Sequence, residues 1–165
     1  MHNEFKEFYQ YSKTMDLPNK DVTVKMLKLN GQKIIATAVC AFGNSQDGGF
    51  LYIGVDSDGT VRGLEKDRVL EGFKDYDDLF ANHIRDRVGE FIGDKVFMTR
   101  KIRIKFRSIE GKTICIIQVL PSDVPLWLHH KSDKIFFVRG AVPRAEKLDP
   151  DEQVRYIRDR FPDYR

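Results

Sequence analysis

The sequence has few cysteines and no long apolar run. Its two cysteines, Cys40 and Cys115, lie inside short apolar stretches, and two are too few for a disulfide framework or a zinc site. No apolar stretch approaches the ~18 residues of a membrane span, and the charged first ten residues contain no apolar core of a signal peptide. These absences argue against secreted, membrane and fibrous classes. They predict a cytoplasmic protein in a reducing compartment.

The sequence also has no internal repeat, no low-complexity tract and little net charge. Its 28 Lys and Arg residues against 25 Asp and Glu leave a formal charge of +3, so any charged patch must be local. Hydrophobic residues make up 41% of the chain, including 12 Phe and 6 Tyr, which is more bulky apolar material than disordered segments contain. A length of 165 residues fits one domain of ~100–200 residues. We therefore expect a single domain over 1–165, complete or part of a longer protein.

The spacing of apolar residues predicts a mixed α/β (α+β) domain. Three segments have apolar positions at helical spacing, whereas the others alternate or form short apolar runs, as strands do. Their order predicts a mostly antiparallel sheet with about three helices packed on it. Helices are expected over 32–42, 77–92 and 149–161, and strands over 4–11, 22–29, 50–55, 60–64, 96–109, 112–120 and 134–140. The segment 22–29 also fits a helix, but its β-branched opening and the Asn30-Gly31 that follows favour a strand.

Two of these elements carry a more specific expectation about burial. The strand 50–55 is apolar on both faces, which is typical of the middle of a covered sheet. The last helix is expected to begin at Asp149 as its N-cap and to turn Val154, Ile157 and Phe161 inward.

Three glycines are expected to be structural. Gly48 and Gly49 lie between a helix end and a buried strand, so one should need a positive φ and the other should let the backbone pass close to the packed helix. Gly59 should occupy the left-handed position of the DSDG turn.

A run of basic residues is the strongest sign of a binding surface. Lys101, Arg103, Lys105 and Arg107 alternate with apolar residues, so a strand would place all four on one face. Six basic residues and no acidic one occur between Lys95 and Arg107. A row of positive charge at ~6.6–7 Å intervals suits a phosphate backbone. The alternative is a solvated edge strand whose charges discourage aggregation.

Other motifs give weaker signals. The stretch 43–50 has the glycines of a phosphate-binding loop but lacks its Lys-Ser or Lys-Thr, and it leads from helix to strand instead of the reverse. The segment 56–59 fits a hairpin turn better than a calcium loop. His129 and His130 have no other ligand at metal-binding spacing.

Acidic residues form a second candidate group. Glu4 and Glu7 lie on the first expected strand, and Asp56 and Asp58 follow the strand 50–55. Metal-dependent nucleases need two or three clustered carboxylates to hold magnesium or manganese. The alternative is that all four are ordinary surface residues, since the sequence does not show whether these strands are adjacent.

The segment CAFGNSQDGGFLYIGVDSDGTVRGL (40–64) closely resembles the signature of the Schlafen AlbA-like domain family. There a helix ending in A-F-A-N precedes a glycine pair, a strand ending in I-G-V-D, and a D-G turn leading to V-x-G-L. Residues 121–145 are similar to the family's S-x-x-P segment and R-G strand, and residues 3–6 to its opening L-E-F-K. The matching positions of the first segment are Ala41, Phe42, Asn44, Gly48, Gly49, Ile53, Gly54, Val55, Asp56, Asp58, Gly59, Val61 and Gly63.

The resemblance implies a mixed α/β fold that binds nucleic acid. Some members of the family are ribonucleases that cut tRNA-like substrates with three carboxylates and a metal ion. By the motif, Glu4 takes the place of the second glutamate and Asp56 or Asp58 that of the aspartate, while the first glutamate would fall before Met1. The second hypothesis is therefore a magnesium- or manganese-dependent endoribonuclease acting on structured, tRNA-like RNA.

The leading hypothesis is a domain that binds the phosphate backbone of DNA or RNA without a cofactor. The four alternating cations of 101–107 would make the contacts, with Arg139 and Arg144 extending the surface. The third hypothesis is a non-catalytic protein-interaction or oligomerisation module whose basic strand serves only solubility. Its partners would be a second copy of the chain or neighbouring domains of a longer protein, and no membrane partner is expected.

Overall fold

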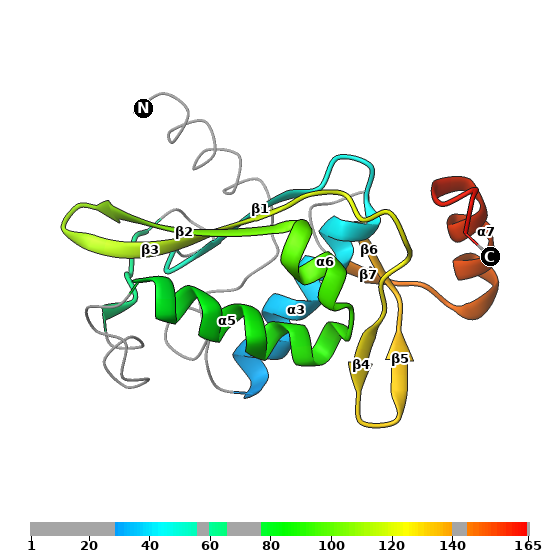
Figure 1. Ribbon diagram of the computed structural model, residues 1–165, viewed down its shortest axis with the longest axis horizontal. Coiled ribbons are helices and arrows are strands. Elements are labelled where there is room, and N and C mark those ends of the chain that lie inside the picture. Colours follow the sequence, from blue (N-terminus) through cyan, green and yellow to red (C-terminus); the bar gives the residue numbers. More distant parts are fainter. Residues whose placement is uncertain (1–28, 56–59, 66–76, 140–144, 165) are drawn as a thin grey trace.

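The computed structural model describes residues 29–55, 60–65, 77–139 and 145–164 (Figure 1). Within these ranges the fold is α+β, as the sequence predicts. Its elements, in chain order, are α3 (Leu29–Asn44), β1 (Gly49–Ile53), α5 (Asp77–Ile92), α6 (Lys95–Arg100), β2 (Ile102–Ile109), β3 (Lys112–Val119), β4 (Leu128–His130), β5 (Asp133–Ile135), β6 (Phe137–Arg139), β7 (Ala145–Lys147) and α7 (Pro150–Arg160).

The centre of the fold is an antiparallel sheet whose described strands have the order β1-β3-β2. Leu51 of β1 and Ile104 of β2 are both aligned with Ile117 of β3. The prediction of a mostly antiparallel sheet is confirmed. The prediction that 50–55 lies in the middle of the sheet is wrong for the strands described, because β3 occupies that place. Because β1 and β3 both have apolar residues on both faces, the apolar pattern does not show which of the two is central.

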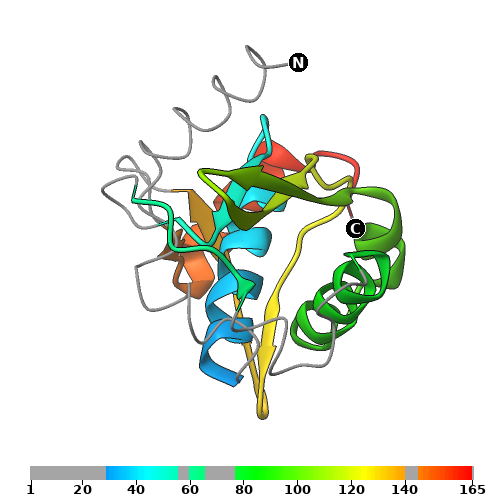
Figure 2. The ribbon, with the colours of Figure 1, turned by 90° about the vertical axis from the view of Figure 1, so that its left-hand side faces the viewer.

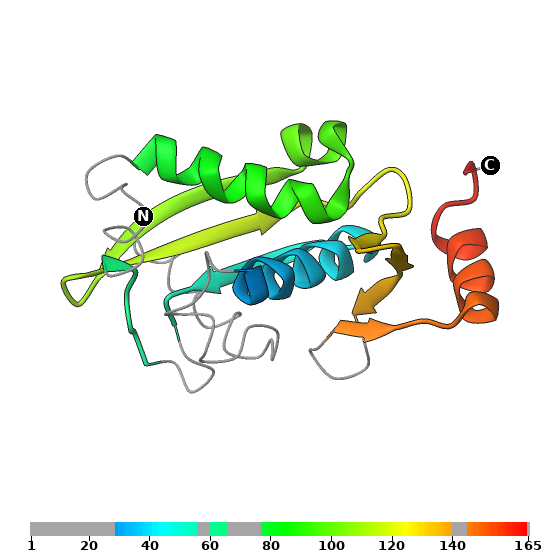
Figure 3. The ribbon, with the colours of Figure 1, turned by 90° about the horizontal axis from the view of Figure 1, so that it is seen from below.

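Helices α3 and α5 cover one face of the sheet. Figure 2 shows both helices on the same side of it, and Figure 3 shows α3 alongside β1 and α5 alongside β2 and β3. The apolar stripes of the two helices meet the sheet in the main core, where Phe42 and Phe80 are fully buried. Cys40 and Cys115 are free thiols in this core, and burial raises the pKa of both.

A smaller apolar cluster lies on the opposite face of the sheet. It consists of Tyr52, Val55, Val61, Ile114 and Ile116. An antiparallel bridge between Val55 and Val61 confirms that the chain returns alongside itself after β1. Burial raises the pKa of the Tyr52 phenol.

The segment predicted as one long strand over 96–109 is divided between a helix and a strand. Residues 95–100 form α6, and β2 begins only at Ile102. Asp94 caps α6 by accepting a hydrogen bond of 2.9 Å from the Phe97 amide. Phe97 and Met98 are both buried, and a strand would have turned these consecutive side chains to opposite faces. The helix α5 occurs over the predicted residues 77–92, and α3 extends the helix predicted over 32–42 at both ends.

Residues 121–147 contain more strands than the sequence predicted. Part of the expected loop forms β4, which pairs with β5 in a hairpin, and the strand expected over 134–140 is divided into β5 and β6. Strand β7, which was not predicted, pairs with β6. The β4–β5 hairpin extends away from the sheet on the side of the helices (Figure 1).

The final helix confirms its predicted cap but only part of its predicted burial. Asp149 accepts from the Glu152 amide at 2.9 Å, and Glu152 accepts in return from the Asp149 amide, which completes a capping box. Phe161 is buried, but Val154 is 56% exposed, so its predicted inward orientation is wrong. The reason is that α7 lies at one end of the molecule, beyond β6 and β7, and not on the sheet (Figure 1).

Several predictions fall outside the described residues. They are the strand over 4–11, residues 22–28 of the strand expected over 22–29, the Gly59 turn position, and the positions of Glu4, Asp56, Asp58 and Arg144. The last residue of the second strand, Leu29, is described, and there the prediction is wrong because Leu29 begins α3. Among the helices that are described, none is both long and apolar enough to cross a membrane.

Asn44, the last residue of α3, joins distant parts of the chain. Its side chain is fully buried and donates to the carbonyl oxygens of Leu126 at 3.0 Å and Phe137 at 2.9 Å, while its Oδ1 accepts from the Leu126 amide at 2.9 Å. Its own carbonyl oxygen accepts from the Tyr156 hydroxyl at 2.6 Å. One residue therefore fixes the end of α3 against the segment before β4, against β6 and against α7.

The glycine pair that follows α3 behaves as the sequence predicts. Gly48 has a φ of +68°, and a Cβ there would overlap the carbonyl oxygen of Val119 on β3. A Cβ on Gly49 would overlap the ring of Phe42 on α3. One glycine therefore supplies the left-handed turn, and the other allows β1 to pass close to the helix.

We expect Gly48→Ala to destabilise the protein more than Gly111→Ala. Both residues have a positive φ, but a Cβ on Gly111 meets nothing within 4 Å. The strained backbone alone should cost about 1 kcal/mol in Gly111→Ala, and the overlap with Val119 should add about 1–3 kcal/mol in Gly48→Ala. Urea unfolding of both variants measures the difference. Equal losses, or a Gly48 variant that keeps its stability but loses ligand binding, would contradict a structural role for Gly48.

Candidate nucleic-acid interface

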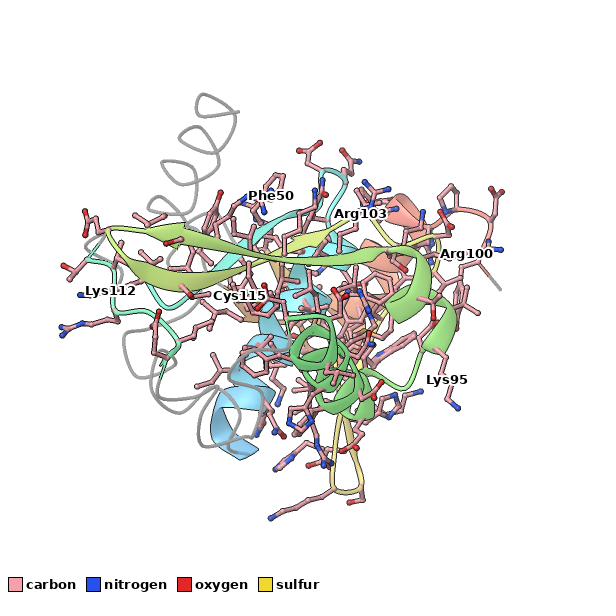
Figure 4. The ribbon with its side chains drawn as sticks, turned by 60° about the vertical axis from the view of Figure 1, so that its left-hand side comes forward. Phe50, Lys95, Arg100, Arg103, Lys112 and Cys115 are labelled. Carbon is pink, nitrogen blue, oxygen red and sulfur yellow. The ribbon has the colours of Figure 1, made fainter. Side chains whose placement is uncertain are left out.

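Strand β2 presents a row of three cations on the face of the sheet opposite the helices. Ile102, Ile104 and Phe106 pack toward the main core, so the alternation of the strand turns Arg103, Lys105 and Arg107 to the other face. All three are exposed, and we call them the basic row. In Figure 4 Arg103 lies on the outer side of the sheet, whereas Cys115 of β3 lies on the side of the helices. The predicted face is confirmed for these three residues.

The basic row has no paired carboxylate among the described residues. Strand β2 contains no Asp or Glu, and among the described residues no carboxylate forms an ion pair with any member of the row. The Arg107 guanidinium donates to the carbonyl oxygen of Phe106 at 3.0 Å. The row is thus a concentration of like charges, which repel one another along a strand and which no described carboxylate neutralises.

Lys101 differs from the other three predicted cations. It is the C-cap residue of α6 and not part of β2, because the strand begins one residue later. Its ammonium lies 3.6 Å from a carboxylate oxygen of Asp123. Lys95 and Arg100 belong to α6, and in Figure 4 Lys95 lies well away from Arg103. The basic run in the sequence is therefore spread over a helix and a strand.

Arg139 contacts the turn between α3 and β1. Its guanidinium donates to the carbonyl oxygen of Gly48 at 3.3 Å and lies 5.2 Å from the centre of the Phe42 ring. The residue is half-buried, and its contacts hold the turn that leads from α3 into β1. The structure thus places Arg139 where it stabilises the glycine turn, which the sequence interpretation did not foresee. Arg144 lies outside the described residues.

The strands beside the basic row contribute residues that the sequence analysis missed. Phe50 of β1 and Arg103 of β2 are both aligned with Gln118 of β3. In the same way Tyr52 and Lys105 are both aligned with Ile116. Directly opposed residues of an antiparallel pair share a face, so Gln118 and Ile116 lie next to the cations, and Phe50 and Tyr52 lie on the same face one strand further away. The sequence contains no signal for this, because it does not state which strands pair.

The nuclease hypothesis is not tested by the described residues. Glu4, Asp56 and Asp58 all lie outside them, and within the described part of the chain no group of three Asp, Glu, His or Cys residues could hold a metal ion. The magnesium or manganese site therefore stays a prediction.

A hollow of about 450 Å³ lies between α5 and α6. Its lining mixes Arg85 and Lys95 with Asp86, Glu90 and Asp94. Since both signs of charge are present, this hollow does not favour a polyanion as the basic row does.

The fold and the site together define a class of protein: an α+β domain with helices on one face of an antiparallel sheet and exposed cations on the other. The sequence matches the profile of the family described as Schlafen, AlbA_2 over residues 2–142. The chain therefore belongs to the Schlafen AlbA_2 family, which indicates a function related to nucleic acid. Strand β7 and helix α7 lie beyond the matched residues.

A solved structure supports the fold. The crystal structure of the DIP2311 protein from Corynebacterium diphtheriae superimposes with a TM-score of 0.55 at 17% sequence identity. The similarity covers 79% of this chain and 22% of that protein, so the chain spans about a fifth of its length. At this identity the likeness concerns the fold alone. Among curated proteins none matches the sequence significantly.

We expect Arg139→Ala to lower stability without changing how the folded protein binds a polyanion. Losing the hydrogen bond to Gly48 and the contact with Phe42 should lower the free energy of unfolding by about 1–2 kcal/mol. Arg103→Ala, the matched control, should leave stability within about 0.5 kcal/mol because the residue is exposed. Thermal unfolding and the salt dependence of binding separate the two effects. An Arg139 variant of normal stability with a reduced salt dependence would show that Arg139 contacts phosphate.

Proposed function

We propose that this domain binds nucleic acid by placing the phosphate backbone along the basic row. The observation that supports this most directly is the exposure of Arg103, Lys105 and Arg107 on one face of β2, with no described carboxylate paired to them. Alternate residues of a strand are ~6.6–7 Å apart, a spacing close to that of successive phosphates. Family membership supports the same ligand class independently.

The electrostatics favour a polyanion over the alternative of a merely solvated strand. A structural surface normally mixes both signs of charge, whereas the charged residues of β2 are all positive. Three aligned cations repel each other in the free protein. A bound phosphate backbone relieves that repulsion and releases condensed counterions, which is the main source of affinity in sequence-independent binding.

We expect Arg103→Glu combined with Lys105→Glu to abolish most binding. The parent should bind single-stranded and duplex probes of DNA or RNA with micromolar or weaker affinity that falls steeply with salt. The double variant should bind at least ~10-fold more weakly at the same salt concentration, because two contacts become repulsive. Fluorescence anisotropy with labelled oligonucleotides measures the affinities.

The matched control is Arg87→Glu combined with Lys95→Glu. This variant has the same change in net charge, but its substitutions lie on α5 and α6. The substitution of Arg87 removes only an exposed ion pair with Glu90, and exposed ion pairs contribute little to stability. The control should bind almost as well as the parent. If both variants lose equal affinity, net charge alone governs binding and the basic row is not the contact surface.

A further inference from the structure

A second hollow lies next to the end of the basic row. It has a volume of about 290 Å³ and is lined by α6, Lys101 and the segment 122–124 that follows β3; we call it the α6 hollow. Arg100 belongs to its lining, and only two residues separate Arg100 from Arg103 along the chain. In Figure 4 Arg100 lies nearer to Arg103 than Lys95 does. The α6 hollow is therefore adjacent to the first cation of the row.

The charged groups around the α6 hollow leave Arg100 as its open cation. The Asp94 carboxylate accepts a hydrogen bond of 2.9 Å from the Phe97 amide as the cap of α6, and the Asp123 carboxylate lies 3.6 Å from the Lys101 ammonium. Arg100 is exposed, and among the described residues no carboxylate forms an ion pair with it. A phosphate that reaches the hollow therefore meets an accessible guanidinium.

The uncharged part of the lining is mostly apolar. Among the described residues five large apolar side chains are exposed, and two of these, Val96 at 65% and Val124 at 39%, line this one hollow. The flat face of a base packs well against apolar side chains. The volume is near the lower limit of the ~300–1,000 Å³ of small-molecule sites, which suits one nucleotide better than a longer ligand.

We infer that the nucleic-acid strand continues from the basic row onto Arg100 and places one unpaired nucleotide in the α6 hollow. Arg100 holds the phosphate of this nucleotide, and Val96 and Val124 pack against its base. This inference rests on the proposed function. It makes single-stranded nucleic acid the preferred ligand, because the bases of a duplex are stacked and paired and cannot enter the hollow without being unstacked.

The first test compares Val96→Glu with Leu79→Glu. Both substitutions place a carboxylate at an exposed apolar position of a helix, but Leu79 belongs to α5 and not to the hollow. Fluorescence anisotropy should show that Val96→Glu weakens binding of a short single strand of RNA or DNA at least ~10-fold, because like charges then meet at the phosphate held by Arg100. Leu79→Glu should bind almost as the parent does. Equal losses in the two variants would overturn the inference.

The second test concerns the phosphate contact and the form of the ligand. Arg100→Gln should reduce the magnitude of the salt slope for the single strand by about 0.7, because one phosphate contact is lost. A duplex of the same sequence should bind the parent more weakly than the single strand does. An unchanged salt slope, or a duplex that binds as tightly as the single strand, would contradict the inference.

A third experiment uses the unaltered protein, so that no substitution can disturb the fold. The methyl NMR signals of Val96 and Val124 should shift when the single strand is added, because a base packed against them changes their magnetic shielding. The methyl signals of Leu79 should stay in place and serve as the control. If the signals of both valines are unchanged at saturation with the strand, the base does not occupy the hollow.

The outcomes separate the two proposals. If the charge reversal at Arg103 and Lys105 abolishes binding while Val96→Glu and the valine signals show no effect, the nucleotide site in the α6 hollow is wrong and the proposed function stands. If the charge reversal leaves binding intact, the proposed function itself fails.

Discussion

The arrangement of this domain depends on the buried amide of Asn44. Its three side-chain hydrogen bonds join it to Leu126 and Phe137, which lie 82 and 93 positions further along the chain. A buried polar group left without partners would cost about 1–3 kcal/mol, so Asn44 favours only the arrangement in which Leu126 and Phe137 meet the end of α3. That arrangement also fixes where the chain leaves α3 and enters β1 through Gly48.

The basic row follows from this arrangement through the pairing of the sheet. Gly48 and Gly49 bring β1 against both α3 and β3, and Arg139 holds the turn by its bond to Gly48. Since α3 and α5 cover one face, the apolar side of β2 must turn toward them. Its three cations then lie on the opposite face, where Arg103 has Gln118 of β3 as its neighbour. The surface is thus a consequence of core packing.

The sequence predicted those features that depend on local pattern. The stripe of α5, the capping residue Asp149 and the roles of Gly48 and Gly49 all follow from neighbouring residues. The sequence does not reveal α6 because its apolar residues run directly into the alternating pattern of β2, although Asp94 is available as a cap. Arg139 could not be placed from sequence, since its partner Gly48 is 91 positions away. The row of Phe50 and Gln118 likewise depends on strand pairing, which residue spacing does not reveal.

The salt dependence of binding by Arg103→Ala tests the central claim most directly. The affinity of the parent and of the variant for a labelled RNA single strand would be measured over a range of salt concentrations. If Arg103 neutralises one phosphate, the slope of log K against log salt should be about 0.7 smaller in magnitude in the variant. An unchanged slope would show that Arg103 contacts no phosphate and that the basic row is not the binding surface.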